Sequence, residues 1–271
     1  MRVLALDFDG VISDSAPESF LVALRTWDAL RPGSGLAADA ARLAGETAPP
    51  LAQVRSSRLY SSFLSHMPLG NRAEDYAVVL AALEQDVPLP DQAAYDAWRD
   101  RQDPAALARF HEHFYVRRGA LAERDPAGWR ALMAPYSEFT ALLRRRAADA
   151  VLAIATAKDR RSVEALLRLY GLDDLFPAER LLDKETGVGK AAHLARLQEQ
   201  TGVPFPEIAF VDDKVNHLDG VRSLGVRCAL AAWGYNGARE EALARQRGYA
   251  VLRLEDAEGL LFAPGPGGNP P

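Results

Sequence analysis

Four short, continuous apolar runs indicate the fold class of this sequence. The first spans residues 2–6, and the others come much later, at 150–156, 208–211 and 226–230. A strand with one face in water alternates polar and apolar residues, whereas continuous apolar runs are typical of strands buried on both faces of a parallel sheet. The sequence therefore predicts a parallel sheet, with residues 251–254 as a candidate fifth strand.

Helical patterns lie between the later apolar runs. Residues 161–170 and 189–200 repeat apolar side chains at intervals of three and four, which is the period of an amphipathic helix. Strands that alternate with helices in this way form an α/β layer whose sheet is covered on both faces. We therefore predict an α/β fold with a doubly wound parallel sheet, built from residues 1–15 and 135–262.

Residues 16–134 follow a different pattern from the rest of the chain. Pro and Gly separate segments of helical periodicity, and no convincing strand occurs among them. The helical segments are residues 18–30, 51–66, 74–84 and 104–118. The sequence thus predicts an all-helical domain that is inserted after the first strand of the sheet.

The composition argues against several classes of protein. A net charge of −5 gives no sign of a broad surface for nucleic acid or a membrane. The single cysteine, Cys228, cannot form an internal disulfide, and no apolar run approaches the roughly 20 residues that span a bilayer. We therefore expect a cytoplasmic protein, either a monomer or a homodimer. Residues 263–271 are rich in Pro and Gly and are expected to be disordered.

Polar residues gather where the predicted strands end. Asp7 and Asp9 follow the first run, and Asp212 and Asp213 follow the third. Because ligands bind at the carboxyl ends of strands in an open parallel sheet, these loops should share one site. Carboxylates so close together repel each other unless a cation lies between them. These residues therefore indicate either a fully solvated strand end or a site that holds a metal. The same edge should also carry Gly10, Thr156, Ala157, Lys158, Lys190 and Asn216.

At these residues the sequence resembles the haloacid dehalogenase-like (HAD) superfamily of hydrolases. DFDGVISDS at 7–15 resembles motif one of the family, AIAT at 153–156 resembles motif two, and FVDDKVN at 210–216 resembles motif four. Lys190 fits motif three better than Lys184, because its separation of 23 residues from Asp213 (213 minus 190) is usual for the family. The resemblance implies a Rossmannoid core, with the helical insert in the position of a type-one cap.

The resemblance also implies a reaction, the hydrolysis of a phosphomonoester with the help of Mg²⁺. Asp7 would attack phosphorus and form an aspartyl-phosphate, and Asp9 would serve as the general acid and base. The metal would be held by the carboxylates of Asp7 and Asp213 and by the backbone carbonyl of Asp9. The phosphoryl oxygens would be bound by Gly10, Thr156, Ala157 and Lys190.

The sequence leaves the metal ligands and the substrate open. Many family members carry an acid four residues after the metal aspartate, where this chain has His217, so Asp212 or a water could complete the ligands. The sequence therefore does not decide whether Asp212 or Asp213 is the main metal ligand. The substrate is expected to be a small phosphorylated metabolite, to which AAWGYNG at 231–237 adds a slight resemblance to phosphoglycolate-phosphatase-type members.

Two alternative functions remain at this point. A phosphomutase of the same fold would keep both Asp7 and Asp9, whereas a dehalogenase generally lacks an acid at the second position. A non-catalytic protein that binds a phosphorylated ligand would be expected to lose one of the core groups. Because Asp7, Asp9, Thr156, Lys190 and Asp213 are all present, we favour the phosphatase.

Overall fold

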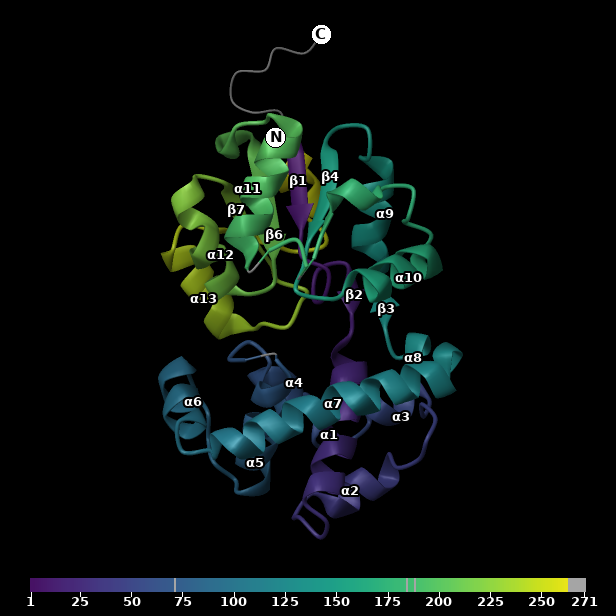
Figure 1. Cartoon of the computed structure of the whole chain (residues 1–271). Helices are drawn as coiled ribbons and strands as arrows, with labels where there is room; N and C mark the ends of the chain where they lie inside the picture. Colours follow the sequence, from purple (N-terminus) through teal and green to yellow (C-terminus); the bar gives the residue numbers. More distant parts are fainter. Residues whose placement is uncertain (71, 184, 188, 263–271) are drawn as a thin grey trace. The chain divides into compact units, whose positions relative to one another are not determined.

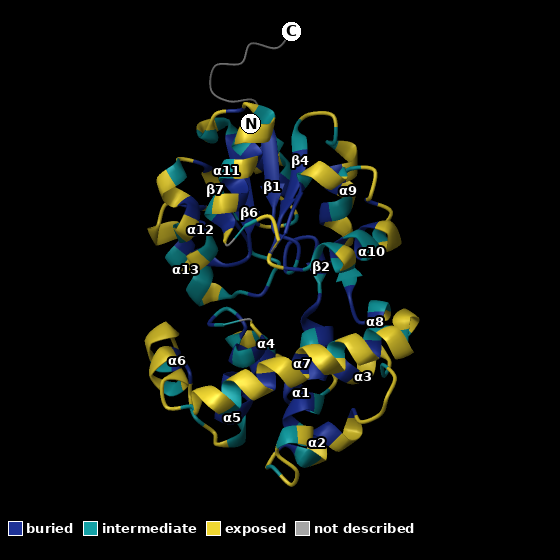
Figure 2. Ribbon diagram, in the orientation of Figure 1, coloured by how far each residue is buried: buried dark blue, intermediate teal, exposed yellow. Residues whose placement is uncertain are grey.

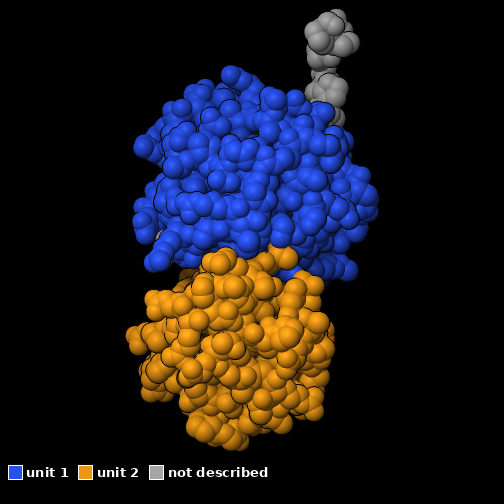
Figure 3. Space-filling view, turned by 90° about the vertical axis from the view of Figure 1, so that its right-hand side faces the viewer, with its two compact units in different colours: residues 1–14, 135–271 blue, residues 15–134 orange. Residues whose placement is uncertain are grey.

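The structure is a computed structural model, and it describes residues 1–262 except positions 71, 184 and 188. The chain divides into two compact units, which Figure 3 shows in different colours. Unit 1 comprises Met1–Asp14 and Pro135–Pro271, and unit 2 comprises Ser15–Ala134. Lys184 and the tail at 263–271, for which the sequence analysis made predictions, lie outside the described residues.

Unit 1 is built on a parallel sheet that has six strands within the described residues, in the order β5-β4-β1-β6-β7-β8 (Figure 1). The strands are β1 (Val3–Leu6), β4 (Val151–Ala155), β5 (Leu181–Leu182), β6 (Ile208–Asp212), β7 (Arg227–Ala231) and β8 (Ala250–Leu252). Val3 of the central strand β1 pairs with Val151 on one side and Ile208 on the other. All four residues of β1 are fully buried, which explains its continuous apolar run. The predicted parallel sheet is confirmed.

Helices cover both faces of this sheet. The helices of unit 1 are α9 (Ser137–Arg145), α10 (Arg160–Tyr170), α11 (Lys190–Thr201), α12 (Val215–Val221), α13 (Ala238–Gln246) and α14 (Ala257–Phe262). The connections through α11, α12 and α13 move across the sheet in one direction, and those through α9 and α10 move in the other. Because such crossovers are right-handed, the two groups of helices lie on opposite faces. The doubly wound arrangement is therefore also confirmed.

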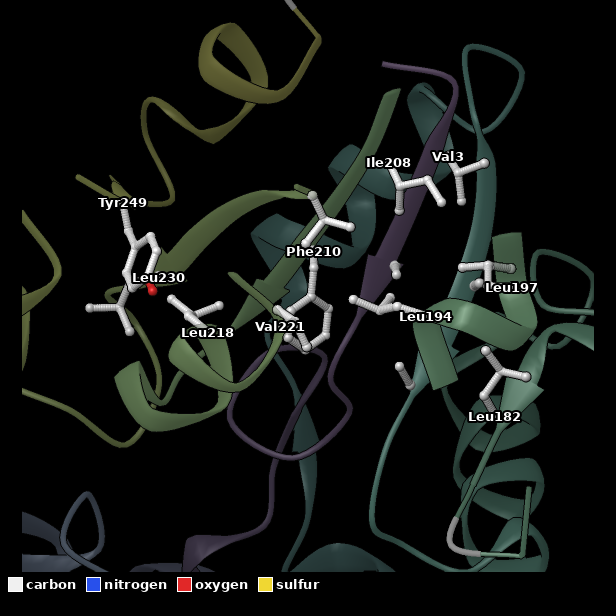
Figure 4. Close-up of a cluster of buried hydrophobic side chains, with 14 of the residues drawn as sticks. Val3, Leu182, Leu194, Leu197, Ile208, Phe210, Leu218, Val221, Leu230 and Tyr249 are labelled. Carbon is white, nitrogen blue, oxygen red and sulfur yellow. The ribbon is translucent and has the colours of Figure 1, made fainter. Parts of the chain in front are cut away.

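A cluster of buried apolar side chains joins one face of the sheet to α11, α12 and α13 (Figure 4). Val3 and Phe210 contribute from the strands, and Leu194 and Leu218 contribute from the helices. Burying a large apolar side chain stabilises the fold by about 1.5–3 kcal/mol. This packing holds the strands rigidly, so their carboxyl ends are fixed positions for polar side chains.

Several short elements were not predicted from the sequence. The edge strand β5 has two residues, and β2 (Ser13–Asp14) pairs with β3 (Ala134–Pro135) in a separate two-stranded sheet. Three 3₁₀ turns occupy Ala178–Arg180, Phe205–Glu207 and Arg222–Leu224. Runs of two or three residues are too short to show a period, so only their neighbours in the folded chain define them.

The described residues of unit 2 form helices and connecting loops up to the start of β3. The helices are α1 (Ala16–Leu30), α2 (Ala37–Arg42), α3 (Leu51–Arg55), α4 (Tyr60–His66), α5 (Ala73–Glu84), α6 (Gln92–Arg99), α7 (Pro104–Arg124) and α8 (Pro126–Ala131). The rings of Phe63, Tyr76 and Phe114 pack in sequence, with centroids 5.3 and 5.6 Å apart. Figure 2 shows that the buried residues of α1 contrast with the largely exposed surface of α7. Across the part of the chain that the structure describes, no helix is long and apolar enough to cross a membrane.

Candidate active site

Asp7 is the first residue after the central strand β1, and it is almost fully buried. Its Oδ1 accepts a hydrogen bond of 2.8 Å from the backbone N–H of Phe8 and lies 2.8 Å from Lys190 Nζ. Burial raises the pKa of Asp7 and the charge of Asp212 raises it further, while Lys190 opposes both effects. The carboxylate is thus held in one orientation at the carboxyl end of the strand.

Lys190 is the first residue of α11, and its side chain connects the ends of three strands. Its Nζ donates to the backbone carbonyl of Ala155, at the end of β4, over 2.7 Å. The same atom lies 2.8 Å from Asp7 Oδ1 and 3.3 Å from Asp212 Oδ2. Burial alone would lower the pKa of Lys190, but the two carboxylates outweigh this effect and raise it. The side chain is therefore an ammonium.

Asp212, at the end of β6, is fully buried and held by several donors. His217 Nδ1 lies 3.1 Å from both of its carboxylate oxygens, and the backbone N–H of Lys214 donates to Oδ1 over 3.0 Å. Burial would raise the pKa of Asp212, but His217 and Lys190 outweigh it, so the pKa is lowered. Asp212 is accordingly an ionised group, and the Lys190 ammonium beside it balances part of its charge.

Asp7, Asp212 and His217 each place one possible ligand atom within 4.8 Å of the others. The Lys190 ammonium already contacts both carboxylates of this group. A second cation among them would have to compete with a positive charge that the protein itself supplies. Internal ion pairs therefore account for this set of three, and a metal ion that uses Asp7 would take its second carboxylate from another residue.

Asp213 differs from Asp212 in its surroundings. It is buried, and its Oδ2 accepts a 2.8 Å hydrogen bond from the backbone N–H of Tyr235. Burial raises the pKa of Asp213 well above its usual value, and the neighbouring charge of Asp212 adds to the effect. The carboxylate packs so closely against Gly10 that a Cβ at that position would lie 2.3 Å from Oδ2. Gly10 also has a φ of +83°, so it is required here for both reasons.

Residues at the end of β7 and just after it also contact Asp213. Asn236 Nδ2 donates to the carbonyl of Asp213 over 3.0 Å and to the carbonyl of Ala231 over 2.8 Å. A Cβ on Gly234 would lie 2.3 Å from the Cβ of Asp213. These contacts come from the stretch AAWGYNG at 231–237, so this stretch fixes the backbone that presents Asp213.

Asp9 lies two residues beyond Asp7 and forms an ion pair with a buried lysine. Lys158 Nζ is 3.1 Å and 3.3 Å from the two oxygens of Asp9, and the lysine side chain is only 4% exposed. The backbone N–H of Lys158 donates to Thr156 Oγ1 over 3.1 Å. Thr156 is buried at the end of β4, whereas Ala157 in the same loop is exposed. The loop after β4 therefore directs a hydroxyl and an ammonium toward one region.

The donor groups at this edge of the sheet suit a divalent cation. The pKa values of Asp7 and Asp213 are both raised, in each case by burial and by the charge of Asp212. A cation beside them would offset that cost, and oxygen ligands are those that Mg²⁺ prefers. The residues present therefore fit a bound magnesium ion.

The structure links many of the site residues proposed from the sequence. Lys190 joins Asp7 to Asp212, and Gly10 packs against Asp213. Sequence reasoning placed Lys158 at this edge without a role, and the structure shows it buried against Asp9. It missed Asn236, Tyr235 and the N–H of Phe8. The stretch at 231–237 was noted for its resemblance to phosphoglycolate-phosphatase-type members. Its contacts with Asp213 involve backbone atoms, and the residue types alone do not predict such contacts.

A comparison with protein families identifies the chain. The family model of haloacid dehalogenase-like hydrolases matches residues 1–225. The chain belongs to this family. The match includes β1, the loop after β4, Lys190 and the Asp212–Asp213 pair, so the resemblance noted at the motifs is confirmed, and with it the hydrolase class.

Individual relatives agree with this membership of the HAD family. Human magnesium-dependent phosphatase 1 is 35% identical over 83 residues, which are 30% of this chain and 46% of that protein. The match thus spans less than half of the relative's length. A solved structure of a predicted phosphoglycolate phosphatase from Haemophilus somnus has a TM-score of 0.64 at 17% identity, covering 96% of this chain and 97% of that one. A haloacid dehalogenase-like family protein from Streptococcus pneumoniae gives 0.61 at 12% identity, with 96% and 98% covered. These two structures share the fold.

Proposed function

We propose that the protein is a Mg²⁺-dependent phosphatase that hydrolyses a small phosphorylated metabolite through an aspartyl-phosphate. The observation that carries the proposal is the buried Asp7, held by the Phe8 N–H and Lys190, with Asp9 two residues further along. Membership of the HAD hydrolases supports the reaction class. The human relative is named for a magnesium-dependent phosphatase activity, which supports the metal and the kind of substrate.

Asp7 is the nucleophile in this proposal. Its carboxylate attacks phosphorus, and the bond from phosphorus to the ester oxygen breaks as the new bond forms. The Phe8 N–H and the Lys190 ammonium keep the carboxylate oriented toward the reacting atom. Because Lys190 is positively charged, it also offsets the negative charge that the two reactants bring together.

Asp9 is the general acid and base. It donates a proton to the leaving alkoxide in the first step and removes a proton from the attacking water in the second. Two carboxylates in one site can take different roles when their surroundings differ. Asp7 is bonded to Phe8 N–H and Lys190, whereas Asp9 is more exposed and contacts Lys158. This difference supports separate roles for the two acids.

The remaining groups bind the phosphoryl oxygens. The Thr156 hydroxyl and the Lys190 ammonium are donors at the end of β4 and at the start of α11, and Gly10 and Ala157 are proposed to let the backbone approach the phosphoryl group. A bound Mg²⁺ would be held by the carboxylates of Asp7 and Asp213 and the carbonyl of Asp9, with Asp212 contributing charge behind them. When bound, the metal would supply Lewis-acid polarisation of the phosphoryl group and neutralise its charge.

The helical insert, residues 16–134, is proposed to act as a cap that selects the substrate. We base this role on the placement of all motif residues in the α/β part, residues 1–15 and 135–262. Because the insert contains no motif residues, its sequence can differ between proteins that act on different leaving groups. Relative rates on a panel of phosphoesters test this role, because equal rates on large and small esters would contradict selection by a cap.

The experiment that tests the function measures phosphate release from small phosphoesters, with Mg²⁺ or with EDTA. The wild type is compared with Asp7→Asn and with Asp173→Asn, a matched control at an exposed position. We expect release that requires Mg²⁺, falls on the order of 10³-fold or more in Asp7→Asn and persists in the control. No release, together with a lasting phosphate on Asp7, would indicate a phosphomutase. Tight binding without turnover would indicate a non-catalytic protein.

A further inference from the structure

Unit 2 contains an open cavity of its own, about 330 Å³ in volume. Helices α1 and α7 form two of its walls, and the loop around Gly45 and Glu46 forms another. The lining includes three arginines, Arg25, Arg117 and Arg124, together with His113. These residues come from separate parts of the chain, so tertiary structure and not a run of basic sequence brings the charges together.

Arg25 is held in a fixed orientation at this cavity. Its Nε donates to the carbonyl of Leu43 over 2.7 Å, and its Nη2 donates to the carbonyl of Thr47 over 2.9 Å. Burial lowers the pKa of Arg25, and the nearby charge of Arg117 lowers it further. Arg25 and Arg117 thus line the same cavity, and Arg25 is anchored there by the two backbone carbonyls.

The charges around the cavity are only partly balanced by the protein. Of the lining residues, Glu46 is the one carboxylate, and its Oε2 lies 2.6 Å from Arg124 Nη1. This pair leaves the charges of Arg25 and Arg117 without a carboxylate among the lining residues. The cavity is therefore positively charged although the whole chain has a net charge of −5.

We propose that this cavity binds a small phosphate dianion, either inorganic phosphate or the phosphate group of a monoester. Guanidinium groups are strong charge-assisted donors to phosphate oxygens, and two of them at one cavity suit a doubly charged anion. Because Arg25 uses Nε and Nη2 on backbone carbonyls, its Nη1 and the guanidinium of Arg117 are the donors proposed for the anion. The volume is at the lower end of the range for small-molecule sites, about 300–1,000 Å³. All the lining residues belong to unit 2 and none lies in a catalytic motif, so this site goes beyond the proposed phosphatase function.

The test measures anion binding to the full-length chain by isothermal titration calorimetry in EDTA. Thr156→Val is present throughout, in order to weaken the proposed phosphoryl site of unit 1. Within that background, Arg117→Gln is compared with Arg109→Gln, which makes the same charge change at an exposed position of α7 that does not line the cavity. Inorganic phosphate and methylphosphonate are the two probes, and methylphosphonate has no ester bond to hydrolyse.

We expect Arg117→Gln to weaken binding of inorganic phosphate by about 10- to 100-fold, the effect of losing a charge-assisted contact, while Arg109→Gln changes it less than about twofold. Methylphosphonate binding as tight as phosphate would show that the site accepts a phosphate group with one substituent, as in a monoester, and binding of phosphate alone would assign it to the free ion. Equal affinities in the two arginine variants would overturn the proposal. Phosphoester hydrolysis by the wild type is measured separately, so failure of this site is distinguishable from failure of the proposed function.

Discussion

Lys190 Nζ lies 2.8 Å from Asp7 Oδ1, and this buried ion pair forms the centre of the candidate site. The same ammonium is 3.3 Å from Asp212, so one cation faces carboxylates at the ends of two adjacent strands. The three side chains are nearly inaccessible to water, with exposures of 8%, 10% and 0% for Lys190, Asp7 and Asp212. Removal of the cation would therefore leave Asp7 without its ion-pair partner and Asp212 with one fewer contact.

Replacing this lysine should destabilise the fold as well as abolish activity. In Lys190→Met the carboxylate of Asp7 loses its ion-pair partner and Asp212 keeps only its contacts with His217 and the Lys214 N–H. Breaking a buried ion pair from one side costs about 3–5 kcal/mol. Urea unfolding measures the free energy of unfolding, and Lys190→Arg, which keeps the charge, serves as the comparison. A Lys190→Met protein as stable as the wild type would show that the pair does not contribute to folding.

Lys158 should matter for turnover more than for stability. Its ammonium contacts both oxygens of Asp9, so Lys158→Gln removes the group that orients the proposed acid and base. We expect kcat/KM to fall about 10-fold or more, in line with the loss of a positioned proton-transfer group. Arg161→Gln, at an exposed position near the start of α10, is the matched control. Equal rates in the two variants would remove Lys158 from the mechanism.

Asn236 should influence metal binding through the backbone of Asp213. Asn236→Ala deletes hydrogen bonds to the carbonyls of Asp213 and Ala231, each contributing about 0.5–1.5 kcal/mol. The Mg²⁺ concentration that gives half-maximal activity should therefore rise, by roughly 10-fold, as expected when a group that orients a metal ligand is lost. An unchanged metal requirement with lower stability would mean that Asn236 only supports the loop.

A buried carboxylate in unit 2 provides a separate test of folding energetics. Glu18 Oε1 accepts hydrogen bonds from Arg118 Nε over 2.8 Å and from Trp129 Nε1 over 3.1 Å. Arg118→Met should destabilise the protein by about 3–5 kcal/mol, because it leaves the buried Glu18 side chain without its ion-pair partner. The double variant Glu18→Gln with Arg118→Met should recover part of this loss. If the double variant is less stable than Arg118→Met alone, charge burial is not the cause.

Cys228 should be slow to react with alkylating reagents in the folded protein. Burial raises the pKa of its thiol to about 11, and the thiolate is the reactive form. At pH 8 the reaction with iodoacetamide should be on the order of 100-fold slower than in the urea-unfolded chain, where the pKa is about 8.5. Because the pKa is raised, the rate should increase about tenfold per pH unit up to pH 10. A rate that levels off near pH 8.5 would contradict the shift.

Local patterns in the sequence were sufficient for the parallel sheet, the helical insert and the edge where the acids meet. Strands such as β1 and β6 are buried on both faces, so their composition directly reflects their environment. Strands of a parallel sheet end at the same edge, and this topological rule gathers Asp7, Thr156 and Asp213 without any knowledge of contacts. The two-residue strand β5 carried no such pattern and was missed.

The partners of each charge were decided only by the folded chain. Asp212 and Asp213 are adjacent and identical in type, yet the pKa of Asp212 is lowered by His217 and Lys190, while the pKa of Asp213 is raised by burial. Lys158 has the same ambiguity in sequence, and burial against Asp9 resolves it. Ionisation depends on solvent access and on charges a few ångströms away in space, and residue order contains neither quantity.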